Sequence, residues 1–107
     1  MIGSIVTVKV DRPLGSRHPK HHNILYPINY GYIEGIISGD GEELDAYILG
    51  VDKPVEQFTG RVIAIIHRLN DVEDKLVVAP DGVSFDKEQI AKVTFFQEQY
   101  FEIRIET

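Results

Sequence analysis

The feature of this sequence that most constrains its fold is a long run of apolar and β-branched residues from Arg61 to Leu69. The apolar side chains of this run fall on both faces of an extended strand, as expected for a central strand that is buried on both sides. Asn70 and Asp71 then supply turn residues before a second apolar run, Lys75–Ala79. We expect the two runs to pair as antiparallel strands.

Three shorter segments also have strand patterns. They are residues 4–10, 31–38 and 45–50, and turn residues follow the first two at 11–16 and 39–41. Together with the two longer runs, they make five expected strands.

Near the end of the chain the pattern changes to that of a helix. Ser84 or Asp86 can cap a helix that runs to about Tyr100. The residues that we expect to face the core are Ile90, Val93, Phe96 or Phe95, and Tyr100. Short strands followed by one terminal helix predict a mainly β fold of the α+β class, a small closed or nearly closed β-barrel with the helix packed on it.

Composition predicts one globular domain that spans residues 1–107. An apolar fraction of 43% is enough for one compact core, and no apolar stretch approaches the roughly 20 residues needed to cross a bilayer. Residues 1–10 lack the charged start and long apolar block of a signal peptide, so we expect a cytoplasmic protein with no membrane partner. The formal net charge of −6 argues against nucleic-acid binding, and the absence of cysteine excludes disulfides, thiolate zinc sites and cysteine nucleophiles.

Acidic residues are concentrated at a turn in the middle of the chain. Asp40, Glu42, Glu43 and Asp45 lie within six residues, where they repel one another unless they are spread apart or neutralised by a cation. Mg²⁺ suits such a set because it accepts one or two carboxylates, keeps several waters and shares its other positions with phosphate oxygens. In isolation, such a turn is more often a solvated loop than a metal site.

A second acidic group lies in the expected turn between the two long runs. It contains Asp71, Glu73 and Asp74. If this turn faces the first at one mouth of the barrel, five carboxylates from two loops could hold two cations. Two metals about 3.5–4 Å apart would bind the attacking and leaving oxygens of a phosphoanhydride at once.

Three strings of residues match the motifs of one known family in order and rough spacing. Tyr26–Ile33 reads Tyr-Pro-Ile-Asn-Tyr-Gly-Tyr-Ile, Asp40–Asp45 reads Asp-Gly-Glu-Glu-Leu-Asp, and Lys75–Pro80 reads Lys-Leu-Val-Val-Ala-Pro. They resemble the Tyr-Pro-x-Asn-Tyr-Gly-Tyr-Ile, Asp-Gly-Asp-Pro-x-Asp and Lys-Leu-Val-Ala-x-Pro segments of the soluble, metal-dependent inorganic pyrophosphatases of family I. The resemblance covers most of residues 5–80. It implies an OB-like five-stranded barrel that uses Mg²⁺, or alternatively Mn²⁺, to hydrolyse pyrophosphate.

The resemblance also implies a role for each matching residue. The implied metal ligands are Asp40, Asp45, Glu73 and one of Asn70 and Asp71, of which Asp71 has the better chemistry. The implied catalytic residues are Glu42, which would orient or deprotonate the attacking water, Lys75, which would hold the departing phosphate, and Tyr30. The implied substrate-binding residues are Lys20, Tyr26, Tyr100 and again Lys75.

The sequence departs from the family pattern at several positions. Only five residues lie between Lys20 and Tyr26, where the family has a hairpin with a further carboxylate and a phosphate-binding arginine. The residues that could replace the missing positive charge are Arg17, His18, His21 and His22. Glu42 replaces an aspartate, and the extra methylene could displace a water by about 1 Å, a shift that can lower a rate roughly a hundredfold. Phe101 stands where the family has a lysine.

The sequence leaves three functions open. The first is Mg²⁺-dependent hydrolysis of inorganic pyrophosphate to two phosphates. The second is a catalytically weak relative that binds metal and phosphate, or a partner protein, on the retained barrel. The third is hydrolysis of a larger phosphoanhydride, because loss of the hairpin could widen the site. An exposed sheet edge at the lost hairpin would also favour a homo-oligomer.

Overall fold

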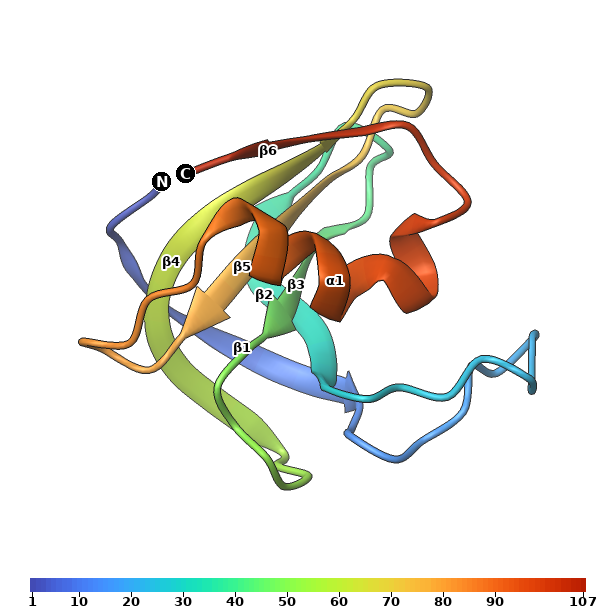
Figure 1. Cartoon of the computed structure of the whole chain (residues 1–107), viewed down its shortest axis with the longest axis horizontal. Helices are drawn as coiled ribbons and strands as arrows, with labels where there is room; N and C mark the ends of the chain where they lie inside the picture. Colours follow the sequence, from blue (N-terminus) through green and yellow to red (C-terminus); the bar gives the residue numbers. More distant parts are fainter.

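The computed structural model describes all 107 residues and is mainly β. Its elements, in chain order, are β1 (Ile5–Arg12), β2 (Asn29–Ile37), β3 (Glu43–Ile48), β4 (Gln57–Arg68), β5 (Asp74–Ala79), α1 (Lys87–Glu98) and β6 (Ile103–Glu106). Figure 1 shows α1 lying across the sheet, with both chain termini beside the middle of β4. With 12 residues, α1 lacks the length and apolar character of a helix that crosses a membrane.

Five of the strands close into a barrel. They are hydrogen-bonded in the order β1-β2-β3-β5-β4, and β1 pairs with β4 to complete the ring. The β3–β5 pair is parallel and the other pairs are antiparallel, so the barrel is mixed. All five expected strands are present, and the antiparallel pairing of the two long runs is confirmed. The predicted small five-stranded barrel with one helix is therefore correct.

Side chains of the barrel strands form two separate hydrophobic clusters. The inner cluster draws on all five barrel strands and contains Val8, Ile33, Leu44, Ala46, Ile48, Val62, Leu76 and Val78. The outer cluster lies between the barrel and α1 and contains Tyr26, Ile28, Tyr30, Tyr47, Leu49, Ala64, Ile66, Val77 and Ile90. An irregularity in β4 between Val62 and Ala64 transfers its buried side chains from the inner to the outer cluster.

Asp86, one of the two predicted caps, begins α1. Its carboxylate accepts from the backbone N–H of Gln89 over 2.8 Å, and the side chain of Gln89 accepts from the backbone N–H of Asp86 over 2.9 Å. This reciprocal capping box satisfies two donors that the first turn of a helix leaves free. Val93 and Phe96 pack against the outer cluster, as expected.

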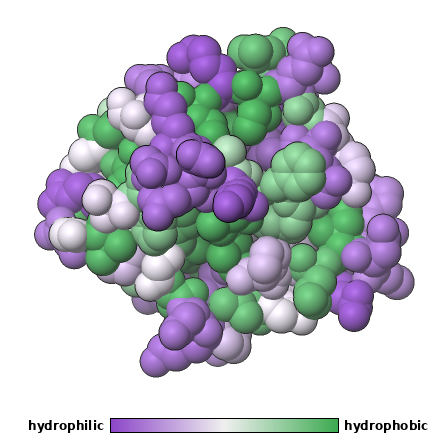
Figure 2. Space-filling view, viewed as in Figure 1, coloured by the Kyte–Doolittle hydropathy of each residue, from purple (hydrophilic) through white to green (hydrophobic).

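The inward face of α1 is more polar than predicted. Phe95 and Tyr100 are 61% and 60% exposed, so their assignment to the core was wrong. Gln97 and Glu98 are buried instead. The reason is that tyrosine hydroxyl groups lie beneath the end of the helix and need hydrogen-bond partners, which these two polar side chains provide. Figure 2 looks onto the outward face of α1, where hydrophilic side chains project and hydrophobic atoms show between them.

The sixth strand was not expected. β6 pairs antiparallel with the end of β4, from Arg68 opposite Ile103 to Ile65 opposite Glu106. Its pairing brings Glu106 to His67 on β4. The His67 side chain is 21% exposed, with hydrogen bonds to Asp74 (3.0 Å) and Glu106 (2.8 Å).

Candidate functional site

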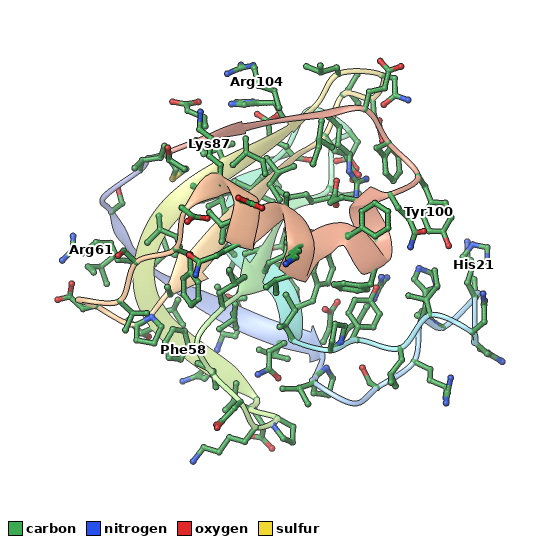
Figure 3. All side chains as sticks on the ribbon, in the orientation of Figure 1. His21, Phe58, Arg61, Lys87, Tyr100 and Arg104 are labelled. Carbon is green, nitrogen blue, oxygen red and sulfur yellow. The ribbon has the colours of Figure 1, made fainter.

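A cleft of about 530 Å³ opens beside the C-terminal end of α1. One side is formed by the loop between β1 and β2, and the other by the β4–β5 hairpin. Three cations line it, Arg12, Arg68 and Lys75, together with the carboxylates of Asp45 and Glu73. Figure 3 shows Tyr100 and His21, two residues of the cleft wall, at the same end of the molecule.

Asp45 joins three neighbouring strands at the base of the cleft. Its Oδ2 atom accepts from the hydroxyl of Tyr30 on β2 over 2.5 Å and from Nζ of Lys75 on β5 over 2.9 Å. Nζ of Lys75 also lies 3.1 Å from Glu73. Burial, and then the charge of Asp45, raises the pKa of Tyr30 well above its ordinary value. Tyr30 therefore stays protonated and acts as a donor.

The two acidic turns meet at the edge of the cleft. A Cβ atom on Gly39 would lie 2.5 Å from the carbonyl oxygen of Val72, so the turns approach each other through their backbones. Their carboxylates, Asp40 and Glu73, are in contact. The hydrogen bond to Glu73, then that from the Ser38 hydroxyl, lowers the pKa of Asp40, whereas burial and the contact with Asp40 raise the pKa of Glu73. The two carboxylates therefore differ in acidity, because Asp40 holds a proton less tightly than usual and Glu73 holds one more tightly.

The other predicted ligands lie apart from this pair. Asp71 lies 3.8 Å from Arg68, and Asp74 faces His67 on another part of the surface. No group of three or more histidine, aspartate or glutamate side chains is close enough to hold one metal ion. The structure therefore brings two carboxylates into direct contact, rather than all five that were predicted to hold two cations, which are Asp40, Asp45, Asp71, Glu73 and Asp74.

The remaining predicted residues differ in how they relate to the cleft. Glu42 is exposed, and its backbone N–H donates to Asp40 over 3.0 Å. Lys20 is exposed in the β1–β2 loop and does not line the cleft. Tyr26 is fully buried behind the wall, whereas Tyr100 lines the wall directly.

Arg68 is a residue of the cleft that the sequence analysis missed. It binds the buried Glu98 through two hydrogen bonds, Nε to Oε1 (3.0 Å) and Nη2 to Oε2 (2.7 Å), and donates to Glu73 over 3.0 Å. Its guanidinium also lies 3.7 Å from the centre of the Phe101 ring. Burial, the largest single influence, lowers the pKa of Arg68, but the bonds to Glu98 and the charge of Glu98, with smaller contributions from Tyr47 and Tyr30, together raise it. Arg68 thus ties the helix end to the hairpin that carries Glu73.

Arg12, at the end of β1, was also missed. Its Nη1 donates to the hydroxyl of Tyr26 over 2.7 Å, and that hydroxyl donates to Gln97 over 2.6 Å. The guanidinium lies 5.7 Å from the centre of the Tyr26 ring and 5.6 Å from that of Tyr30. No motif signals this position, because Arg12 follows a strand and precedes Pro13 like any turn residue.

The β1–β2 loop supplies two of the four residues proposed to replace the missing charge. His18 and His21 line the cleft, with ring centres 5.0 Å apart. Arg17 instead donates to the backbone carbonyl of His22, so neither residue reaches the wall. Backbone hydrogen bonds across the loop hold it together, on either side of an antiparallel bridge between Arg17 and Leu25.

The fold and the cleft define a closed mixed barrel with a charged site at the end of its helix. The model of the inorganic pyrophosphatase family matches residues 6–104, and the chain belongs to this family. Among solved structures, an inorganic pyrophosphatase from Neisseria gonorrhoeae has a TM-score of 0.70 at 23% identity, over 92% of this chain and 74% of that one. An inorganic pyrophosphatase from Ehrlichia chaffeensis has a TM-score of 0.73 at 15% identity, over 99% and 87%. Comparison with curated protein sequences finds no match.

Proposed function

We propose that this chain hydrolyses inorganic pyrophosphate to two phosphates with Mg²⁺ as cofactor. The observation that carries the proposal is the meeting of the two acidic turns, which brings Asp40 to Glu73 at the edge of the cleft that Asp45, Lys75 and Tyr30 line. Membership of the inorganic pyrophosphatase family supports this choice of substrate. Cleavage of a phosphoanhydride needs mainly charge neutralisation and an aligned water, and the cleft offers residues for both.

The carboxylates at the cleft edge fit Mg²⁺. Two carboxylates in contact repel each other unless a proton or a cation lies between them, and burial and the contact with Asp40 raise the pKa of Glu73 accordingly. Mg²⁺ is held in proteins by one or two carboxylates with waters and phosphate oxygens. Asp45 and Asp71 are the other two residues that the family resemblance implies as ligands. Bound Mg²⁺ would neutralise phosphate charge and make a coordinated water more acidic.

The other residues have roles that follow from their positions. The Lys75 side chain is 4% exposed, and its ammonium contacts Asp45 and Glu73. One of its N–H groups can turn from these carboxylates to donate to the departing phosphate. Tyr30, held protonated, orients Asp45 through its hydrogen bond. Glu42, on the turn that Asp40 closes, would orient the attacking water, a role that the family resemblance implies. Tyr100 lines the wall where substrate would enter, and the exposed Lys20 would have to move to reach it.

Phosphate release from pyrophosphate tests the proposal. We expect release in Mg²⁺, weaker release in Mn²⁺, and none after chelation. Asp40→Asn and Asp45→Asn should abolish it, whereas Asp52→Asn, which removes the same charge from an exposed residue outside the cleft, should not. Release that persists after chelation, or in both cleft variants, would contradict the proposal.

A larger phosphoanhydride is the second candidate substrate. Ile24, Tyr100 and Phe101 line the same cleft as the charged residues, and pyrophosphate has no group for such apolar and aromatic surfaces. A nucleoside diphosphate or triphosphate has a planar base that could pack there. Parallel assays with pyrophosphate and ATP decide between the two candidates by their kcat/KM values.

A further inference from the structure

Arg12 differs from the other two cations of the cleft because no carboxylate is paired with it. Lys75 lies within 3.1 Å of both Asp45 and Glu73, and Arg68 is bound to Glu98 and Glu73. The hydrogen bond that Arg12 makes is to the neutral hydroxyl of Tyr26. A guanidinium has five N–H donors, so most of those on Arg12 remain available to an anion in the cleft.

The orientation of Arg12 is fixed before any anion binds. The hydroxyl that it contacts belongs to a fully buried tyrosine, Tyr26, which is itself held by Gln97 on α1. The rings of Tyr26 and Tyr30 both lie within 6 Å of the guanidinium carbon, at 5.7 Å and 5.6 Å. A planar guanidinium held in this way loses little conformational entropy when it binds phosphate through two parallel hydrogen bonds.

His18 offers a further donor on the same wall. Its Nδ1 atom accepts from the backbone N–H groups of Lys20 and His21, each over 3.1 Å. The neutral ring therefore carries its proton on Nε2, which is the donor that it can present to the cleft. Burial, and then the charge of Arg12, lowers the pKa of His18, which favours this neutral form.

We propose that Arg12 and His18 form an anion-binding subsite that holds one phosphate group of the substrate on the side of the cleft opposite Lys75. Tyr30, on β2, divides the two sides, because β1 with Arg12 pairs with one edge of β2, whereas β3 and then β5 with Lys75 follow on its other edge. The Arg12 guanidinium lies 5.6 Å and Nζ of Lys75 5.9 Å from the centre of the Tyr30 ring. The subsite itself requires only a phosphate group. Its assignment to one end of pyrophosphate rests on the proposed function.

Titration calorimetry with inorganic phosphate tests the subsite directly, in the absence and presence of Mg²⁺. Arg12→Gln should weaken phosphate binding about 10- to 100-fold, because a hydrogen-bonded charge is lost. Arg12→Lys should recover part of the affinity, since it restores the charge without the planar fork. Arg104→Gln is the matched control, because it removes an arginine from the exposed face of β6, outside the cleft (Figure 3), and should leave phosphate affinity unchanged.

Steady-state kinetics with pyrophosphate provide the second measurement. Arg12→Gln should raise KM by a larger factor than it lowers kcat, because the subsite binds substrate and does not act at the reacting bond. Thermal unfolding of each variant shows whether it is folded. Should Arg12→Gln fail to fold, Arg12→Lys decides, because it must bind phosphate more weakly than the unchanged chain.

The outcomes separate the subsite from the proposed activity. If the chain hydrolyses pyrophosphate and Arg12→Gln keeps the phosphate affinity and KM of Arg104→Gln, the subsite is wrong and the activity stands. If pyrophosphate is not hydrolysed but phosphate binds and Arg12→Gln loses it, the subsite stands and the activity is wrong. If the unchanged chain binds neither phosphate nor pyrophosphate, the subsite is overturned.

Discussion

Lys75 and Tyr30 donate to the same oxygen of Asp45, over 2.9 Å and 2.5 Å. The three residues lie on β5, β2 and β3, so this one carboxylate oxygen connects three strands at the base of the cleft. The Lys75 ammonium is 4% exposed, and a buried ammonium is costly without a carboxylate beside it. Asp45 therefore stabilises the barrel and sets the position of Lys75 at the same time.

Asp45→Asn should affect both activity and stability. We expect pyrophosphate hydrolysis to fall at least about 100-fold, because Lys75 and Tyr30 lose the charge that positions them. The free energy of unfolding should fall by about 1–3 kcal/mol, since Lys75 keeps only Glu73 as an anionic partner. Urea unfolding and phosphate release measure the two effects. The exposed Asp52→Asn should change neither, and an Asp45→Asn protein as active as this control would refute the assignment.

The buried ion pair of Arg68 and Glu98 predicts a large loss of stability when it is broken. The two side chains are 5% and 1% exposed, so Arg68→Met leaves an unpaired carboxylate in the protein interior. We expect this change to lower the free energy of unfolding by about 3–5 kcal/mol. Glu73 would also lose a donor, so activity should fall in the fraction that remains folded.

An exposed arginine gives the matched control for Arg68. Arg61 pairs with Asp81 at 2.9 Å, but the two side chains are 40% and 71% exposed. Arg61→Met should lower the free energy of unfolding by about 1 kcal/mol or less, because solvent screens such a pair. Equal losses in the two variants would show that burial of the Arg68 pair contributes nothing.

The fold was predictable from sequence because each barrel strand carries its own pattern and ends at turn residues. β6 lacked such a signal, because Ile103 and Ile105 alternate with Arg104 and Glu106 over only four residues. Its strand character depends on the partner β4, which apolar periodicity cannot reveal. Phe95 was assigned inward because a rule that buries apolar residues does not foresee that the helix end covers hydroxyl groups, which need polar partners.

The candidate site was predictable only in part. The contact between Asp40 and Glu73 follows from two acidic turns at one end of a barrel, which the sequence indicates. Arg12 and Arg68 could not be found in this way, because each is a single charged residue at the end of a strand. Their importance comes from what they contact, Tyr26 for one and Glu98 for the other, and those partners are far away in the chain.

Gly31 predicts a steric effect at the closure of the barrel. A Cβ atom at this position would lie 1.9 Å from the backbone carbonyl oxygen of Lys9 on β1, too close for any adjustment short of separating the strands. Gly31→Ala should therefore lower the free energy of unfolding by about 3 kcal/mol or more. Urea unfolding monitored by circular dichroism measures the change.

Gly41 is the matched control for Gly31. It has a φ of +84° and no atom within 4 Å of an added Cβ, so Gly41→Ala meets backbone strain but no clash. We expect it to cost about 1–2 kcal/mol. If the free energy of unfolding of Gly31→Ala is equal to or higher than that of Gly41→Ala, β1 and β2 are not packed as closely as the structure has them.

Tyr47 predicts how stability depends on alkaline pH. Burial, followed by the charge of Glu98, raises the pKa of Tyr47 well above its ordinary value of 10.0. A folded pKa above the unfolded one means that the folded chain keeps a proton that the unfolded chain releases. The stability from this group is therefore fully present below pH 10 and is lost progressively as the pH rises above it.

Urea unfolding at neutral and alkaline pH, with tyrosinate absorbance followed in parallel, measures this dependence. Tyr47→Phe should flatten the decline in the free energy of unfolding above about pH 10, because the phenyl ring has no proton to release. Its stability at neutral pH should fall by about 1 kcal/mol, since Glu98 and Gln97 lose their bonds to the hydroxyl at 2.5 Å and 2.8 Å. Tyr100→Phe, at an exposed position, should keep the decline of the unchanged chain. If both variants keep that decline, Tyr47 ionises in the folded protein as readily as in the unfolded one, and its hydroxyl is not buried against Glu98.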